Sequence, residues 1–152
     1  IAQKIKTKKD ITLLTNSLEV LMELSDVTGW KILSTGGSLK ERSSALIGSQ
    51  AEECLERFHV DKAFISCKGV DAEHGFSDSS DAHAAVKRKM IAAASQVFFA
   101  VDSSKFGKLS FTSISGFSGV DAVITERCPN EEWNRIFIAN DIECLYPRGE
   151  QK

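Results

Sequence analysis

The sequence predicts an α/β fold in which a mostly parallel sheet carries helices on both faces. Short runs rich in β-branched and aromatic residues alternate with helical stretches along the chain, and this alternation favours parallel strands joined by right-handed crossovers. Residues 97–101 (Val-Phe-Phe-Ala-Val) form an unbroken apolar run, the kind that is buried on both faces of a parallel sheet. These two observations together predict the fold class.

The elements follow in order along the chain. Short β-rich runs bounded by turn residues predict strands at 11–15, 30–34, 61–66, 97–101, 120–125 and 142–145. Apolar residues at helical spacing predict helices at 17–25, 46–58, 81–95 and 130–139. The lysine-rich residues 1–9 are typical of the end of a helix, residues 68–80 predict a long polar loop, and Pro147 with a charged tail ends the fold.

Length and composition favour one globular domain. The chain has 152 residues, of which 42% are hydrophobic and 26% charged, close to the average of folded domains. Its net charge of −2 argues against a domain that grips DNA by itself. No apolar run reaches the ~18 residues of a membrane span and no signal peptide is predicted, so we expect a cytoplasmic protein without membrane contact. The first residue is not Met, and we expect a fragment of a longer protein.

Polar and glycine residues follow the predicted strands. They are Asn16-Ser17, residues 35–38 (Thr-Gly-Gly-Ser), residues 68–71 (Lys-Gly-Val-Asp) and residues 102–107 (Asp-Ser-Ser-Lys-Phe-Gly). Ligands of open parallel sheets bind beyond the carboxyl ends of the strands, and backbone amides, glycines and lysines suit a phosphate. Lys87, one turn or more into its helix, is close enough to this edge to reach an anion. Turn geometry and capping are the alternative explanation for any single loop.

No cofactor or metal signature is present. The sequence lacks a G-x-x-x-x-G-K-[ST] loop, a G-x-G-x-x-G turn after a strand and a G-x-S-x-G elbow. The four cysteines are scattered and are expected to be free thiols. His74 with Asp71, Asp78 and Asp81 is a weak candidate for a metal site, and an Asp-rich loop is more often simply solvated. Asp71 and Glu73 as an acid/base pair have an unspecific spacing.

Several motifs in fixed order carry a resemblance to a known family. They are residues 64–71 (Phe-Ile-Ser-Cys-Lys-Gly-Val-Asp), 75–78 (Gly-Phe-Ser-Asp), 86–90 (Val-Lys-Arg-Lys-Met), 100–107 (Ala-Val-Asp-Ser-Ser-Lys-Phe-Gly) and 120–125 (Val-Asp-Ala-Val-Ile-Thr), with 14–18 and Gly36-Gly37 in the expected places. Together they resemble the C-terminal sensor domain of DeoR-family transcriptional regulators. The match covers nearly the whole chain.

This resemblance implies a Rossmann-like sheet of the kind found in ribose-5-phosphate isomerases and CoA transferases. It also implies an effector-binding domain over residues 1–152 that senses a phosphorylated sugar or related intermediate, forms homo-oligomers and modulates operator binding, usually in a repressor of carbohydrate use. Carried over, the ligand-binding candidates are Asn16, Gly37, Lys68, Gly69, Asp71, Lys87 and Lys105. The two lysines at 87 and 105 would neutralise phosphate, and Asp71 would accept sugar hydroxyls.

Two departures from the family pattern matter. The N-terminal helix-turn-helix domain is absent from this chain, so we expect DNA contact only through that domain. The family's Asp-x-Gly-Thr-Thr phosphate loop is also missing, and we expect the chain to lack that loop and the first strand. Two alternatives stay open: a sugar-phosphate isomerase-like enzyme with Asp71 or Glu73 as base, and an oligomerising domain whose site is vestigial.

Overall fold

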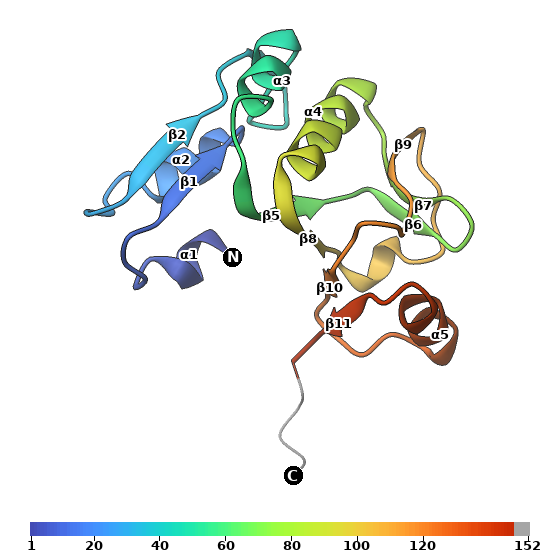
Figure 1. Ribbon diagram of the computed structural model, residues 1–152. Helices are drawn as coiled ribbons and strands as arrows, with labels where there is room; N and C mark the ends of the chain where they lie inside the picture. Colours follow the sequence, from blue (N-terminus) through green and yellow to red (C-terminus); the bar gives the residue numbers. More distant parts are fainter. Residues whose placement is uncertain (148–152) are drawn as a thin grey trace. The chain divides into compact units, whose positions relative to one another are not determined.

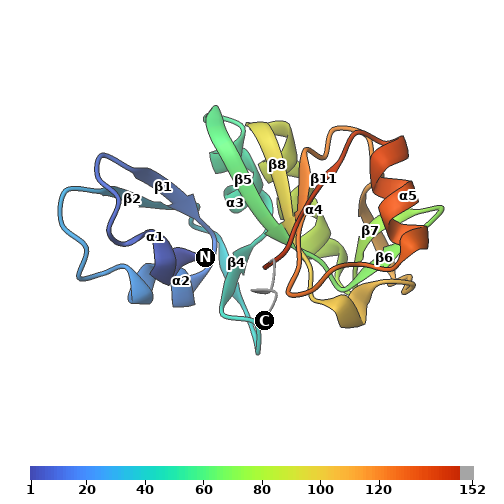
Figure 2. The ribbon, with the colours of Figure 1, turned by 90° about the horizontal axis from the view of Figure 1, so that it is seen from below.

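The apolar run at 97–101 lies in an interior strand of the parallel sheet, but the expectation that it is buried on both faces is wrong for the described residues. Val97, Phe99 and Val101 are buried, whereas Phe98 on the opposite face is half-buried and its neighbour Phe64 is exposed. This strand, β8 (Ala94–Ala100), lies between β5 (Val60–Ser66) and β10 (Ala122–Ile124), and β11 (Glu143–Leu145) completes a four-stranded parallel sheet in the order β11-β10-β8-β5. Phe98 pairs with Phe64 on one side and with Ala122 on the other. Figure 2 shows these strands running side by side. The mostly parallel sheet flanked by helices confirms the predicted fold class.

The computed structural model describes residues 1–147 and divides the chain into two units, Ile1–Arg57 and the part from Phe58 onward. The charged tail after Pro147 lies outside the described residues. Figure 1 gives the labels of the elements in both units. Among the described residues, no helix is long and apolar enough to cross a membrane.

The first unit is built around two small sheets. Strands β1 (Thr12–Thr15) and β2 (Lys31–Ser34) pair in parallel, while β3 (Ser38–Lys40) and β4 (Ala45–Ile47) form an antiparallel hairpin. Its helices are α1 (Ala2–Ile5), α2 (Leu18–Glu23) and α3 (Ser49–Leu55). The side chain of Ser17 accepts a hydrogen bond from the Val20 N–H and so caps α2.

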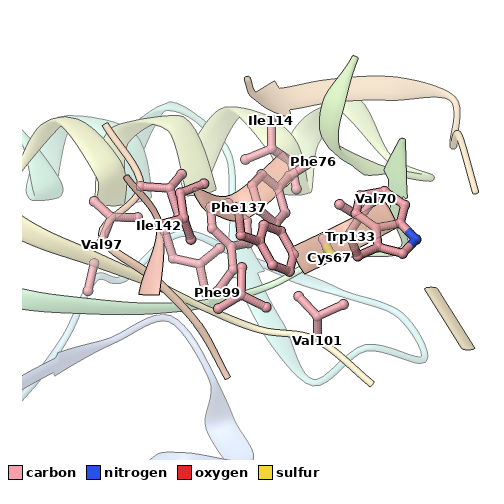
Figure 3. Close-up of a cluster of buried hydrophobic side chains, with 14 of the residues drawn as sticks. Cys67, Val70, Phe76, Val97, Phe99, Val101, Ile114, Trp133, Phe137 and Ile142 are labelled. Atoms are coloured by element: carbon pink, nitrogen blue, oxygen red, sulfur yellow. The ribbon is translucent and has the colours of Figure 1, made fainter. Parts of the chain in front are cut away.

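The second unit has one hydrophobic core on one face of its parallel sheet. Helix α4 (Asp81–Ala92) and helix α5 (Glu131–Ala139) both contribute to it, together with the strands β6 (Gly69–Asp71), β7 (Gly75–Asp78) and β9 (Thr112–Ser115). Figure 3 shows Phe76 of β7, Phe99 of β8 and Phe137 of α5 meeting at its centre. The rings of Phe76 and Phe99 stack with their centroids 3.8 Å apart, and both are fully buried.

The prediction of a polar loop at 68–80 is wrong. This segment holds β6 and β7, which with β9 form a three-stranded antiparallel sheet. All four residues of β7 are buried, including the polar Ser77 and Asp78. Ser77 Oγ donates to the Gly69 carbonyl and accepts from the Ser110 N–H. The polar residues looked solvated in sequence because their partners come from segments distant along the chain.

Other boundaries also differ from the prediction. The helix predicted at 46–58 begins only at Ser49, because residues 45–47 pair with 38–40 as a strand. The strand β9 was not predicted, and β8 begins at Ala94, where the helix over 81–95 was expected to continue. The short 3-10 helix η1 (Ser103–Lys105) follows β8. In each case tertiary pairing, rather than local propensity, determines the boundary.

The aromatic stack makes a specific prediction about stability. Replacing Phe99 with Ala should lower the free energy of unfolding by about 3–5 kcal/mol, because it removes a fully buried ring and leaves a cavity in the core. Phe111→Ala is the matched control, since this ring is 84% exposed and should change stability little. Chemical denaturation of both variants measures the difference, and equal losses would contradict this account of the core.

Candidate functional site

The polar residues after the parallel strands of the second unit lie at one edge of its sheet. Cys67 and Lys68 follow β5, residues 102–105 follow β8, and Thr125 with Glu126 follow β10. Because β5, β8 and β10 are parallel neighbours, their carboxyl ends meet at this edge. The expected ligand edge of the second unit is therefore formed by these three strand ends.

Lys87 of α4 makes an ion pair with a carboxylate that sequence analysis did not select. Its Nζ lies 2.5 Å from Asp78 Oδ2 at the end of β7, and the Asp78 side chain is only 3% exposed. Burial raises the pKa of Asp78, but hydrogen bonds from Lys87 and from the amides of Ser79 and Ser80 outweigh it and hold that pKa below its usual value. The pair joins α4 to β7.

Sequence analysis named Asp78 in the family motif 75–78 and as a weak metal-ligand candidate, but not as a ligand-binding residue. Its burial in β7 would have been difficult to anticipate, because nothing in the local pattern marks residues 75–78 as a covered strand. A lysine at position 87 on the helix that follows was the one available signal, since a buried carboxylate requires a partner.

The pKa of the buried Cys67 thiol depends on the charged groups near this edge of the sheet. Burial raises its pKa to about 12, while the positive charges of Lys87 and Lys105 lower it and the negative charge of Asp78 raises it. These three charged groups therefore lie within electrostatic range of the carboxyl end of β5. A thiol with so high a pKa is not a nucleophile near neutral pH.

Lys105 sits in a loop that other residues hold in place. Asp102 caps the short helix η1 by accepting from the Ser104 N–H at 3.0 Å, and Lys105 Nζ lies 3.7 Å from Asp102 Oδ2. Both carboxylate oxygens of Glu126 accept from the Ser103 N–H, at 2.9 and 3.1 Å. Hydrogen bonds from the Ser103 hydroxyl and from the backbone amides of Glu126 and Ser103 lower the pKa of Glu126 to about 2. Glu126, which sequence analysis missed, thus ties the end of β10 to this loop.

The remaining candidates of the second unit serve in part to build the fold. Lys68 is exposed, and its backbone N–H donates to the Ser77 carbonyl. Gly69 is buried, and a Cβ there would lie 2.3 Å from the Lys108 carbonyl oxygen, so this close approach by itself requires glycine. Asp71 Oδ1 accepts from the N–H groups of Glu73 and His74 in the turn between β6 and β7.

Asn16 and Gly37 belong to the first unit. The Asn16 side-chain amide donates to the Leu46 carbonyl at 2.9 Å and so connects the end of β1 to β4. Gly37 has φ +108°, and a Cβ there would lie 2.6 Å from the Ile47 carbonyl oxygen. The two units are described separately. That the seven candidate residues form one ligand site therefore stays a prediction.

The His74–Asp71 contact does not extend to a metal centre. His74 Nδ1 lies 2.7 Å from Asp71 Oδ1, but residues 1–147 contain no group of three or more His, Cys, Asp or Glu side chains placed to hold a metal ion. All four cysteines are free. Asp78, once grouped with His74, is engaged by Lys87 instead.

The same contact predicts a pH dependence. Its hydrogen bond to Asp71 raises the pKa of His74, and the bond from His74 lowers the pKa of Asp71. The pair therefore stabilises the turn fully between the ordinary pKa of aspartate and that of histidine, and it loses this effect as pH rises through the raised pKa of His74. At acid pH the effect is lost as pH falls through the lowered pKa of Asp71. We expect Asp71→Asn to return the pKa of His74 toward its usual value in an NMR titration.

An exposed carboxylate elsewhere provides the control for this titration. Asp61→Asn removes the same charge from the beginning of β5 and should leave the His74 curve where it is in the wild-type protein. An unchanged His74 curve in Asp71→Asn would show that the ring is not held by Asp71.

Comparison with known proteins places this chain in a family. A sequence model described as the DeoR C-terminal sensor domain matches residues 1–127. The chain is 40% identical to the HTH-type transcriptional regulator YulB of Bacillus subtilis over 123 residues, 81% of this chain and 48% of that protein. It is 38% identical to the HTH-type transcriptional repressor GlcR of the same organism over 142 residues, 93% of this chain and 55% of that protein.

A third relative comes from another organism. The putative aga operon transcriptional repressor of Escherichia coli O157:H7 is 31% identical over 126 residues, 83% of this chain and 47% of that protein. The chain thus spans about half the length of the curated relatives it matches. With most of its described residues matched by the family model and by these regulators, the chain belongs to the family of DeoR C-terminal sensor domains.

Proposed function

We propose that this chain is the effector-sensing and oligomerising part of a transcriptional regulator of sugar metabolism, acting in the cytoplasm as a repressor. Its effector is a phosphorylated sugar or a related intermediate. Effector binding modulates operator binding by an N-terminal helix-turn-helix domain outside this chain. The relatives named as transcriptional repressors and as HTH-type regulators support this role.

The observation that carries the proposal is the gathering of two lysines at one strand end. Lys105 lies in η1, directly after β8, and Lys87 of α4 is paired with Asp78 at the end of β7. The positive charge of each lysine lowers the pKa of the Cys67 thiol at the end of β5. Lysines placed as point charges beside backbone amides suit a phosphate group. Oδ1 of Asp71 accepts hydrogen bonds from backbone amides of the turn, and its Oδ2 is the oxygen that would accept a hydrogen bond from a sugar hydroxyl. Lys68, exposed after β5, supplies a further positive charge.

The complete sensor domain contains more than this chain in our proposal. We propose that a strand and an Asp-x-Gly-Thr-Thr phosphate loop precede residue 1, and Asn16, Gly37 and Gly69 stay predicted ligand residues. The isolated two-stranded parallel sheet β1–β2 supports this extension, because a sheet of two strands is marginal by itself. Binding experiments therefore use the intact protein.

The isomerase-like alternative finds less support in the geometry. A general base near neutral pH requires a carboxylate whose pKa is raised. Asp71 has the opposite shift, because hydrogen bonds from His74 and from the turn amides stabilise its charged form. The family of transcriptional regulators points to binding without turnover, and we propose that the chain is not an enzyme.

A thermal-shift panel tests the proposal directly. The intact protein is heated with individual sugar phosphates and with each unphosphorylated parent sugar. An effector at 100 times its dissociation constant should stabilise the protein by about 2.7 kcal/mol. We expect one phosphate to raise the melting temperature while its parent does not. No shift with any compound would overturn the proposed effector class, and turnover of a sugar phosphate would favour the enzyme.

The role assigned to Lys105 is tested with a matched pair of lysine variants. Lys105→Gln should weaken binding of the active sugar phosphate by about tenfold, since it removes a charge-assisted contact to the phosphate. Lys62→Gln removes the same charge from the exposed side of β5 and should leave the dissociation constant unchanged. Titration calorimetry measures both, and equal effects would assign the loss to overall charge instead.

The same ligand should act on assembly and on DNA. We expect the intact protein to sediment as a homo-oligomer in analytical ultracentrifugation. The active sugar phosphate should weaken operator binding in a fluorescence anisotropy titration, whereas its parent sugar should not. A monomer at micromolar concentration would contradict the oligomer.

A further inference from the structure

Asp78 places a buried negative charge directly beside one of the two lysines at the candidate ligand edge. Its side chain is 3% exposed, and Oδ2 accepts from Lys87 Nζ at 2.5 Å while Oδ1 accepts from the Ser80 N–H at 3.2 Å. The carboxylate is thus fixed by two contacts in a strand with every residue buried. It cannot turn away when a second anion approaches Lys87.

Lys87 is less enclosed than its partner. Its side chain is 16% exposed, and an ammonium group has three N–H donors. Asp78 uses one of them in the contact described above. The ammonium group therefore keeps donors for a ligand, but its charge is already balanced by the carboxylate behind it.

We propose that Asp78 is a built-in competitor for Lys87 that weakens the binding of phosphorylated ligands at this edge. This inference rests on the proposed function, because it assumes that Lys87 meets the phosphate. A bound phosphate shares Lys87 with Asp78 and lies within several ångströms of a second negative charge. At the effective dielectric of partly buried sites, that repulsion is substantial.

The competing account is that the ion pair only connects α4 to β7. The two accounts predict different changes in ligand affinity when the charge of Asp78 is removed. A purely structural pair predicts that removal of the Asp78 charge leaves ligand affinity unchanged or lowers it through loss of order. A competitor predicts that affinity rises, which loosening of the structure would not produce. Asparagine at this position retains an oxygen that accepts from Lys87, so Asp78→Asn isolates the charge.

The test measures binding of inorganic phosphate, and of the sugar phosphate with the largest thermal shift, to the intact protein at constant ionic strength. Asp78→Asn should bind both at least about tenfold more tightly than the wild-type protein. Asp81→Asn is the matched control: it removes the same charge three residues away, where the side chain is 73% exposed, and should change affinity less than about twofold. The unphosphorylated parent sugar should not gain affinity in either variant.

A second measurement covers the case in which Asp78→Asn does not fold. In the wild-type protein, the carboxyl carbon resonance of Asp78 should move as phosphate is added, while that of Asp81 should not. A stationary Asp78 resonance at saturating phosphate would overturn the proposal, as would unchanged or weaker phosphate binding by a folded Asp78→Asn protein. After either outcome, the proposed function would still stand if the wild-type protein bound a phosphorylated compound. A wild-type protein that binds no phosphorylated compound would remove the proposed function and, with it, this inference.

Discussion

The packing of Phe76 on Phe99 is the contact on which the rest of the second unit depends. It places the antiparallel sheet β6-β7-β9 against the central strand β8 of the parallel sheet, with α5 contributing Phe137 to the same core. Two large rings that are fully removed from water supply a substantial part of the hydrophobic stabilisation in a chain of this size. The stack anchors β7 against the core, while its pairing with β6 and β9 sets the register of its residues.

The electrostatics of the candidate site are a consequence of that packing. Because β7 is held against the core, Asp78 two residues after Phe76 is buried, and hydrogen bonds from Lys87 of the following helix and from the amides of Ser79 and Ser80 keep its pKa below the usual value. The ion pair in turn fixes Lys87 beside the end of β5. Core packing therefore contributes to the position of Asp78, and the ion pair with Asp78 holds the end of the Lys87 side chain.

Most of the parallel strands could be anticipated from local pattern, while the ligand-binding role of the site candidates stays a prediction. Alternation of short apolar runs with helical stretches was enough to place β1, β2, β5, β8, β10 and β11, since runs rich in β-branched and aromatic residues between turn residues carry a strong signal in a short window. The antiparallel sheet was not anticipated, because Ser77 and Asp78 are polar and their burial depends on partners at Ser110 and Lys87. Glu126 was missed for the same reason: its partner Ser103 is 23 positions away.

The sequence by itself determined the fold class, the order of the parallel strands along the chain and the polar character of the loops that follow them, because these depend on the type and spacing of neighbouring residues. Tertiary structure alone decided the burial of β7, the pairing of Lys87 with Asp78 and the clamp of Glu126 on the Lys105 loop. It also assigned Gly69 to a close backbone contact with Lys108. Partners such as these are chosen by distances in space, which local sequence does not encode.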